Sequence, residues 1–528
     1  MDIKRAKQEI KDTIEAYLAK DSFGEYRIPT IRQRPVLLMG PPGIGKTQIM
    51  EQISKECQIG LVAYTITHHT RQSAVGLPFI KEKTYGGKVF SVTEYTMSEI
   101  IASVYDKMEQ TGIREGILFI DEINCVSETL APVMLQFLQG KTFGNQKVPE
   151  GWIIVAAGNP PEYNKSVRDF DVVTLDRLKK IDVTADFEVW KEYAYRQGLH
   201  PAVISYLELR KMNFYRVETT VDGKLFATAR GWEDLSQLIQ VYETLGKHVD
   251  RDVVYEYIQH RMIAKDFANY LELYDKYRTD YGVEDILLGK WLPVTLQKIR
   301  SAALDERLSI VGLLNGRLSE LFGKCGETDA FVTKLYEYML YYKENMESGA
   351  AEPDRAMPQR SMDRADGIKK PDGISAEDVY QKAEMDMEAL RKTELLTRKE
   401  EQTWKQVLEF LEKAALRVKG GFLSGDKAYA CVKKLFEQEA DELEQLTERT
   451  GQTLQNVFDF LEAAFGEGQE MVFFITELNA NSHSMWFIKE NGSDSYYRYN
   501  KGLLFDWRQK AILSEMNQVE DLLNHGIR

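Results

Sequence analysis

The chain has 528 residues, with 43% hydrophobic and 28% charged residues, which is ordinary for a globular protein of more than one domain. Its net charge of −14 argues against a general nucleic-acid binder, because such proteins rely on a basic surface, although a local basic pore stays open. Four scattered cysteines without a Cys-x-x-Cys pair argue against a disulfide framework and a zinc site. No apolar run has the length of a membrane span and the N-terminus lacks a signal-peptide core, so we expect a cytoplasmic protein without a membrane partner.

Up to about residue 183, short apolar runs alternate with helical patterns. The runs are continuously apolar, which favours a parallel sheet covered on both faces. Helical connections between parallel strands imply right-handed crossovers and a ligand crevice at the carboxyl ends of the strands. The predicted strands are Pro35–Met39, Leu61–Thr65, Gly116–Ile120, Ile153–Ala157 and Lys180–Val183, and the predicted helices are Lys46–Cys57, Thr96–Glu109, Ser127–Gly140 and part of Pro161–Leu178.

The segment Gly40–Thr47, GPPGIGKT, lies between the first strand and the first of these helices, the context that a phosphate-binding loop requires. Its glycines let backbone N–H groups wrap a polyphosphate, and the following helix adds its positive dipole end. Lys46 can neutralise the β- and γ-phosphates, and the Thr47 hydroxyl can bind Mg²⁺. The residues assigned to nucleotide binding are Gly40, Pro41, Pro42, Gly43, Ile44, Gly45, Lys46, Thr47 and Gln48.

Two further apolar runs end in polar residues. Ile117–Asn124 carries Asp121 and Glu122, which at the carboxyl end of a buried strand would face the phosphate loop. Asp121 would then hold Mg²⁺, directly or through water, and Glu122 would polarise the water that attacks the γ-phosphate. Asn159, at the end of the run Trp152–Asn164, could orient that water or a phosphate oxygen. The alternative for Asp121 and Glu122 is a pair of solvated acids after a strand. The alternative for Asn159 is an asparagine favoured in the turn before two prolines.

Arg177 lies at the end of a helix, just before a predicted strand. It could stabilise charge on the γ-phosphate, in some ATPases from a neighbouring subunit, and Arg168 is a rival for this role. A surface salt bridge with Asp176 or Asp182 is the alternative.

Arg230 begins a helix, where a cation is disfavoured unless it has an anionic partner. Nucleotide phosphate is one such partner, and Glu233 or Asp234 is the alternative. The adjacent His68 and His69 follow the second strand, and because neighbouring strand residues point to opposite faces we expect no shared metal there. The other possibility for these two histidines is a polar position next to the nucleotide.

Beyond this region the sequence is mostly helical. Two hairpins interrupt the helical patterns: Gly86-Gly87 signals one within the first 183 residues, and Asp222-Gly223 signals the other beyond them, each between β-prone arms. The stretch Lys343–Gly373 has three prolines and few large apolar residues, which is typical of a linker, and Ser375–Val418 continues as one long helical pattern. The predicted domains are an ATPase core 1–183, a helical lid with a small hairpin 184–290, a helical extension 291–342, a flexible linker 343–374 and a helical C-terminal module 375–528.

The ordered series of motifs resembles an AAA+ ATPase, with most similarity to the MoxR-type and dynein-related branch. The resemblance covers roughly residues 1–290 and rests on GPPGIGKT, HHTRQSAVGLP before the Gly86-Gly87 hairpin, LFIDEIN, VAAGNPPEYN, LDRLKKIDV and ARGWEDLS. It implies an α/β fold: a parallel P-loop NTPase sheet with flanking helices, followed by an α-helical lid, and the rest of the chain reads as mostly helical.

By this resemblance Gly40–Thr47 is the Walker A loop, Asp121 and Glu122 are the Walker B acids, and the Gly86-Gly87 hairpin is a helix-2 insert. Asn159 becomes sensor 1, Arg177 the arginine finger acting in trans, and Arg230 sensor 2.

The resemblance also implies a function: hydrolysis of ATP with Mg²⁺ in a hexameric homo-oligomeric ring, with chaperone-like remodelling of a partner that often carries a von Willebrand factor A domain. An assembly scaffold with little turnover is an alternative, although intact Lys46, Asp121 and Glu122 argue against it. A McrB-like motor of a nucleic-acid-acting complex is another, disfavoured by the acidic balance.

Overall fold

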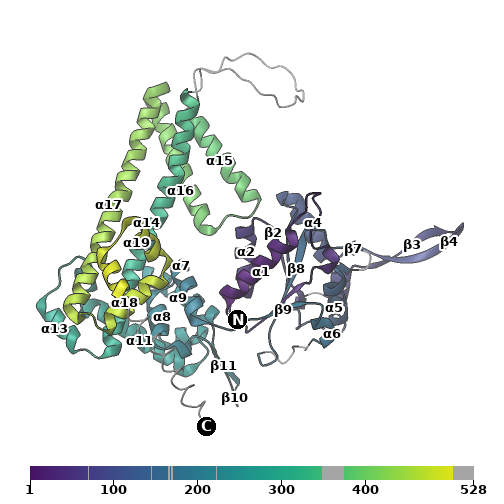
Figure 1. Cartoon of the computed structure of the whole chain (residues 1–528), viewed down its shortest axis with the longest axis horizontal. Helices are drawn as coiled ribbons and strands as arrows, with labels where there is room; N and C mark the ends of the chain where they lie inside the picture. The colour runs from purple at the N-terminus through teal and green to yellow at the C-terminus, as the bar shows by residue number, and fades with distance from the viewer. Residues whose placement is uncertain are drawn as a thin grey trace, which may run out of the picture. The chain divides into compact units, whose positions relative to one another are not determined.

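The computed structural model of the chain describes residues 1–68, 70–143, 146–163, 167, 170–221, 223–347 and 374–502 (Figure 1). The chain forms two compact units. The first comprises residues 1–189, 228–231 and 382–404, and the second comprises 190–227, 232–381 and 405–528. Within the described ranges, no helix combines the length and apolar character that crossing a membrane requires.

A five-stranded parallel sheet forms the centre of the first unit, with the strand order β2-β5-β8-β1-β9. The inner strands are buried along nearly their whole length, which is why their sequences are continuously apolar. The predicted parallel sheet and its five strands are confirmed. The strands are β1 (Val36–Met39), β2 (Gly60–Thr65), β5 (Gly116–Asp121), β8 (Trp152–Gly158) and β9 (Lys179–Asp182).

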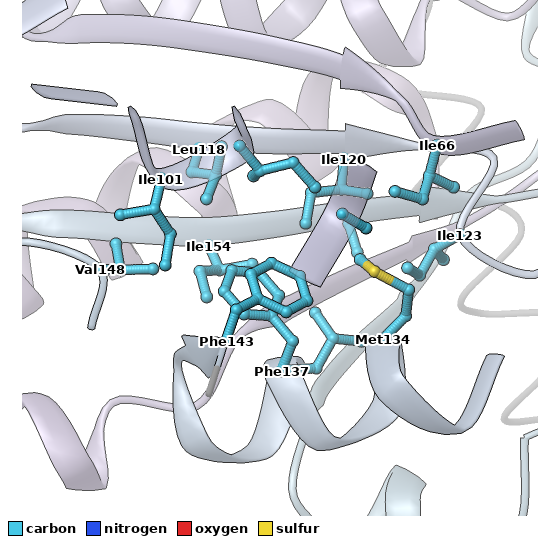
Figure 2. Close-up of a cluster of buried hydrophobic side chains, with 14 of the residues drawn as sticks. Ile66, Ile101, Leu118, Ile120, Ile123, Met134, Phe137, Phe143, Val148 and Ile154 are labelled. Carbon is cyan, nitrogen blue, oxygen red and sulfur yellow. The ribbon is translucent and has the colours of Figure 1, made fainter. Parts of the chain in front are cut away.

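Helices cover the sheet on both faces. Figure 2 shows Leu118 and Ile120 of β5 and Ile154 of β8 in one buried cluster with Met134 and Phe137 of a helix. The intervening residues of β5 point to the other face, where α2 contacts β2 and β5 and α1 packs on α2. The longer helices of this unit are α1 (Ile3–Leu18), α2 (Lys46–Cys57), α4 (Glu99–Thr111) and α5 (Ala131–Gly140). Two short helices, α3 (Arg71–Val75) and α6 (Val172–Leu175), also belong to it.

Both predicted hairpins are present. Gly86 and Gly87, with φ angles of 57° and 79°, connect β3 (Pro78–Tyr85) to β4 (Lys88–Tyr95), as a turn with two left-handed residues requires. In the second hairpin β10 (Arg216–Thr220) pairs with β11 (Gly223–Ala227). Gly223 already pairs with Thr220, so it is a strand residue and not part of the turn as predicted, and Asp222 lies outside the described residues. A two-residue pair, β6 (Thr142–Phe143) and β7 (Gln146–Lys147), follows α5.

Apart from β10 and β11, the residues that the structure describes in the second unit are mostly helical. The helix α14 continues to Glu347, so residues 343–347 are helical and not part of a linker, while residues 348–373 lie outside the description. The single pattern predicted over Ser375–Val418 divides into two helices, α15 and α16. The helices from residue 187 onward are α7 (Phe187–Gln197), α8 (Pro201–Leu209), α9 (Ala229–Thr244), α10 (Arg251–Tyr257), α11 (Arg261–Asp280), α12 (Val283–Leu287), α13 (Pro293–Ser301), α14 (Leu304–Glu347), α15 (Ala376–Lys392), α16 (Arg398–Gly420), α17 (Gly425–Phe465), α18 (Gln469–Ala480) and α19 (Ser482–Asn491).

Candidate nucleotide-binding site

The loop between β1 and α2 is shaped by its glycines. Gly43 and Gly45 have φ angles of 74° and 91°, in the left-handed region that glycine adopts without a steric penalty. A Cβ atom on Gly40 would lie 2.9 Å from the carbonyl oxygen of Val183, so a side chain there would force a neighbour to move. Gly45 is the N-cap of α2, and the first N–H groups of a helix lack intrahelical partners. The loop therefore offers backbone N–H groups and a positive helix end to an anion.

Lys46 is buried in this loop, with 8% of its surface exposed. Its ammonium donates hydrogen bonds to the carbonyl oxygens of Gly40 at 2.7 Å and Pro41 at 2.8 Å, and to Oδ1 of Asn159 at 2.8 Å. Burial lowers the pKa of Lys46 to about 8, with the charge of Arg230 adding to the effect and the carboxylate of Asp121 opposing it. Because all three acceptors are neutral, a phosphate oxygen would supply the counter-charge that they do not.

Asp121 and Thr47 supply oxygen atoms suited to magnesium. The Thr47 hydroxyl donates to Oδ2 of Asp121 at 2.9 Å, and Oδ1 accepts the N–H of Glu122 at 2.8 Å. Mg²⁺ prefers oxygen ligands and usually keeps waters and substrate phosphates in its shell. The described residues include no cluster of three or more histidines, cysteines or acids that could hold a metal ion by themselves. The pair fits Mg²⁺ that binds together with a nucleotide.

Glu122 has an unusual backbone conformation, with a φ angle of 56° in the left-handed region. Its Oε2 accepts a hydrogen bond from the hydroxyl of Thr67 at 3.1 Å. Thr67 lies in a 3-10 turn, Ile66–His68, directly after β2. Such backbone outliers cluster at functional sites, and here a neighbouring strand end holds the side chain as well. Thr67 was not among the predicted site residues, because its only signal in the sequence is a hydroxyl two residues after a predicted strand.

Asn159 is held by a second asparagine. Its N–H donates to Oδ1 of Asn124 at 3.2 Å, and Nδ2 of Asn124 donates to its carbonyl oxygen at 2.8 Å. Gly158 makes room for this pair, because a Cβ atom there would lie 2.7 Å from Oδ1 of Asn124. Asn124 fixes the backbone at this strand end and leaves the Asn159 side chain directed at Lys46. Asn124 lies in the motif LFIDEIN, but no role was predicted for it from the sequence.

Arg177 lies on the surface of the first unit, between α6 and β9. Its guanidinium donates to the side-chain oxygen of Gln139 on α5. Among the described residues, no hydrogen bond or ion pair joins it to the Gly40–Thr47 loop, so the structure does not bring it to the phosphate loop of its own chain. The rival Arg168 lies outside the described residues.

Arg230 lies beside the phosphate loop. Its backbone N–H donates to the carbonyl oxygen of Gly43 at 3.2 Å, and its Cβ is 3.4 Å from where a Cβ on Gly43 would be. Its charge also contributes to the lowered pKa of Lys46. The alternative partner Glu233 accepts a hydrogen bond from Tyr193 at 2.7 Å. A second cation next to Lys46 raises the positive charge at the place where an anion would bind.

The adjacent histidines His68 and His69 follow β2 in the sequence. His68 ends the 3-10 turn that carries Thr67, and His69 lies outside the described residues.

Residues 36–175 match the family model "ATPase family associated with various cellular activities (AAA)". The matched range includes the phosphate loop, Asp121, Glu122 and Asn159, and it ends before Arg177 and Arg230. A search of curated proteins gave no match to the chain. Together with the five-stranded parallel sheet, the family match supports a nucleotide-binding P-loop ATPase region of the AAA+ type.

Proposed function

We propose that this chain is a Mg²⁺-dependent ATPase of the MoxR-type and dynein-related AAA+ branch that assembles into a ring and remodels a protein partner. One observation carries the ATPase assignment. Lys46, Asp121 and Asn159, from three separate chain segments, meet where β1, β5 and β8 end. The branch is supported by the sequence motifs and by the β3–β4 hairpin that follows the segment HHTRQSAVGLP.

Each residue then has a chemical task. Lys46 and Arg230 bind phosphate oxygens, and the oxygens of Thr47 and Asp121 hold Mg²⁺. The bound ion neutralises charge that develops on the phosphates. Glu122 orients the attacking water and accepts its proton, and Asn159 turns from Lys46 to that water or to a phosphate oxygen.

The decisive experiment compares Lys46→Ala with Glu122→Gln. Lys46→Ala should abolish binding of a fluorescent ATP analogue, because the site loses its central cation. Glu122→Gln should bind ATP normally but lower kcat at least about 100-fold, since an amide cannot accept the proton. Normal turnover by Glu122→Gln would show that this acid has no catalytic role.

The exposed position of Arg177 suits action on the nucleotide of a neighbouring subunit. In that arrangement Arg177→Ala and Glu122→Gln are each inactive alone, but a mixture contains interfaces with an intact arginine opposite an intact acid. We expect the mixture to recover measurable ATPase activity. Absence of recovery in a mixture that forms rings of normal size would contradict the trans arrangement.

Remodelling of a protein partner, such as one with a von Willebrand factor A domain, is the proposed use of this ATPase cycle. The Glu122→Gln protein with ATP should retain its client, because the cycle halts before hydrolysis. Co-purification with ATP but not with ADP is the expected result, and Lys46→Ala is the matched control.

A further inference from the structure

Asn124 is a buried polar residue that the proposed mechanism does not use. It lies three residues after Asp121, the last residue of β5, and only 2% of its surface is exposed. Its Oδ1 accepts the N–H of Asn159 at 3.2 Å, and its Nδ2 donates to the carbonyl oxygen of Asn159 at 2.8 Å. One side chain that follows β5 therefore binds both backbone polar groups of the residue that follows β8.

These two bonds extend the pairing of β5 with β8 past the end of both strands. The register of the two strands ends at the pair Ile120 and Ala156. Just beyond it, the N–H of Ile123 donates to the carbonyl oxygen of Ala157 at 2.9 Å. A side-chain amide offers a donor and an acceptor, as a peptide group does, so Asn124 takes the place of a further strand residue beside β8.

Gly158, the last residue of β8, leaves the room that Asn124 needs. A Cβ atom on Gly158 would lie 2.7 Å from Oδ1 and 2.9 Å from Cγ of Asn124, and 3.0 Å from the sulfur atom of Met39. The flexible Met39 side chain could move aside, but Asn124 is held by its hydrogen bonds. The φ angle of Gly158 is not in the left-handed region, so glycine is required here for the close approach and not for the backbone conformation.

The hydrogen bonds of Asn159 show when Asn124 matters. Within the described part of the chain they are the two to Asn124 and the one that Oδ1 of Asn159 accepts from Lys46 at 2.8 Å. In the proposed mechanism Asn159 turns from Lys46 to the attacking water or to a phosphate oxygen, so the bond to Lys46 is lost. The two bonds to Asn124 then remain to fix the position from which the amide acts.

We propose, on the basis of the proposed ATPase function, that Asn124 is a positioning residue that keeps Asn159 in place for hydrolysis once ATP has drawn Lys46 away. Its bonds tie Asn159 to the segment that carries Asp121 and Glu122, so the amide and the two acids keep a fixed separation. A displacement of about 1 Å in a group that orients a reactant can lower the rate about 100-fold. Asn124 therefore acts on kcat through Asn159, without touching the nucleotide itself.

The test compares Asn124→Ala, Asn159→Ala and the double variant in steady-state ATPase assays of the full chain. Asn124→Ala should lower kcat about tenfold or more, while the affinity for a fluorescent ATP analogue changes less than about twofold, because Lys46 and the phosphate loop are unaltered. In the Asn159→Ala background, Asn124→Ala should lower kcat less than about twofold, since the residue through which it acts is already missing. The milder Asn124→Ser keeps a hydroxyl and should show the same pattern with a smaller loss.

The matched control is Asn481→Ala in the second unit. Asn481 is 3% exposed and, like Asn124, its side chain accepts a backbone N–H, that of His483 at 2.9 Å, and donates through Nδ2, to the Ser319 hydroxyl at 2.8 Å. Asn481→Ala should lower thermal stability, because a buried donor and acceptor lose their partner, but leave kcat unchanged.

Three results would overturn the role of Asn124 alone in a chain that hydrolyses ATP. They are an unchanged kcat in Asn124→Ala, an equal loss of kcat by Asn124→Ala in both backgrounds, and a normal kcat in Asn159→Ala. The second of these is the result that a merely structural role predicts. An unaltered chain that binds no nucleotide and hydrolyses no ATP would overturn the proposed function and the role of Asn124 together.

Discussion

The buried lysines of the two units stand in different surroundings: the first unit buries Lys46 and Lys141, and the second buries Lys191. Lys46 of the first unit has only neutral acceptors, and burial lowers its pKa to about 8. Lys191 of the second unit, 1% exposed, binds Glu208 at 2.6 Å and Glu477 at 2.9 Å. Burial alone would lower the pKa of Lys191, but the two carboxylates outweigh it and raise the pKa above its usual value. The lack of an ion pair does not by itself mark a ligand site, because Lys141 also donates only to a carbonyl oxygen, that of Thr30 at 2.8 Å, and burial lowers its pKa to about 8. Lys46 differs from Lys141 because it lies in the loop between β1 and α2, whereas the paired Lys191 stabilises the fold.

The pairing around Lys191 is extensive. The second oxygen of Glu477 accepts a hydrogen bond from Tyr195, and Glu208 also binds Lys211 at 2.8 Å. These residues join α7 and α8 to α18, across 286 positions of sequence between Lys191 and Glu477. The helices on the two sides of the undescribed segment 348–373 are therefore fixed to each other by a buried polar network.

The largest expected effect comes from replacing Lys191 or Lys46 singly by methionine. Lys191→Met leaves two carboxylates buried without a cation and should lower the free energy of unfolding by about 3–5 kcal/mol. Lys46→Met leaves neutral acceptors without a donor but also removes a buried charge, so it should lower the free energy of unfolding by less, about 1–2 kcal/mol, yet it should abolish ATP binding. Urea unfolding followed by circular dichroism measures the first quantity, and nucleotide titration the second.

A double variant is the control for this pair. Lys191→Met with Glu477→Gln should recover part of the lost stability, because one of the unpaired charges is removed. The contrast fails if Lys46→Met destabilises the protein as much as Lys191→Met does.

The second prediction concerns pH. With a pKa of about 8 in the nucleotide-free protein, Lys46 is charged at pH 7 and largely neutral at pH 9.5. Above pH 8 the site must take up a proton to bind a polyphosphate, so the affinity for ATP should fall by up to about tenfold per pH unit. Nucleotide titrations at pH 7, 8 and 9.5 measure this, and Lys46→Arg, which stays charged, should remove the dependence. An affinity that is constant over this range would show that Lys46 keeps its proton.

Stability responds to pH in a different way at the two sites. The folded-state pKa of Lys191 is raised, so its ion pairs contribute in full below the unfolded pKa of about 10.5 and are lost only as pH rises through the folded pKa. The folded-state pKa of Lys46 is depressed, so its contribution to stability rises between pH 8 and 10.5. Neither lysine should therefore make the nucleotide-free protein less stable between pH 7 and 9.5.

The third prediction tests whether the Thr67 hydroxyl positions Glu122 for catalysis. Thr67→Val removes the hydroxyl that holds Glu122, and we expect kcat to fall about three- to tenfold with little change in KM. Thr67→Ser keeps the hydroxyl and should restore most of the rate. A purely structural role for Thr67 would instead change KM and thermal stability in both variants.

The sequence predicts what local patterns determine. The bounds of α2, Lys46–Cys57, follow from the glycine before it, and β5 and β8 follow from continuous apolar runs. Because parallel strands end at the same edge, the approach of Asp121 to Thr47 was also predictable.

Contacts without a local pattern were not predictable. A single hydroxyl such as Thr67 resembles many others, and nothing near Lys191 indicates a partner at Glu477. The helical pattern over Ser375–Val418 hides a break, because apolar spacing continues across the turn between α15 and α16.

The smallest effect is expected at Asn315 on α14, whose buried amide differs from the paired Lys191. Asn315 is 5% exposed, and within the described residues neither its Nδ2 nor its Oδ1 has a hydrogen-bond partner. An unpartnered buried amide is destabilising, so Asn315→Leu, which keeps the volume, should raise the free energy of unfolding by about 1–2 kcal/mol. Asn315→Ala would leave a cavity and should not raise the free energy of unfolding. Urea unfolding of the two variants therefore separates the effect of polarity from that of volume. Destabilisation by Asn315→Leu would mean that a bound water satisfies the amide in solution.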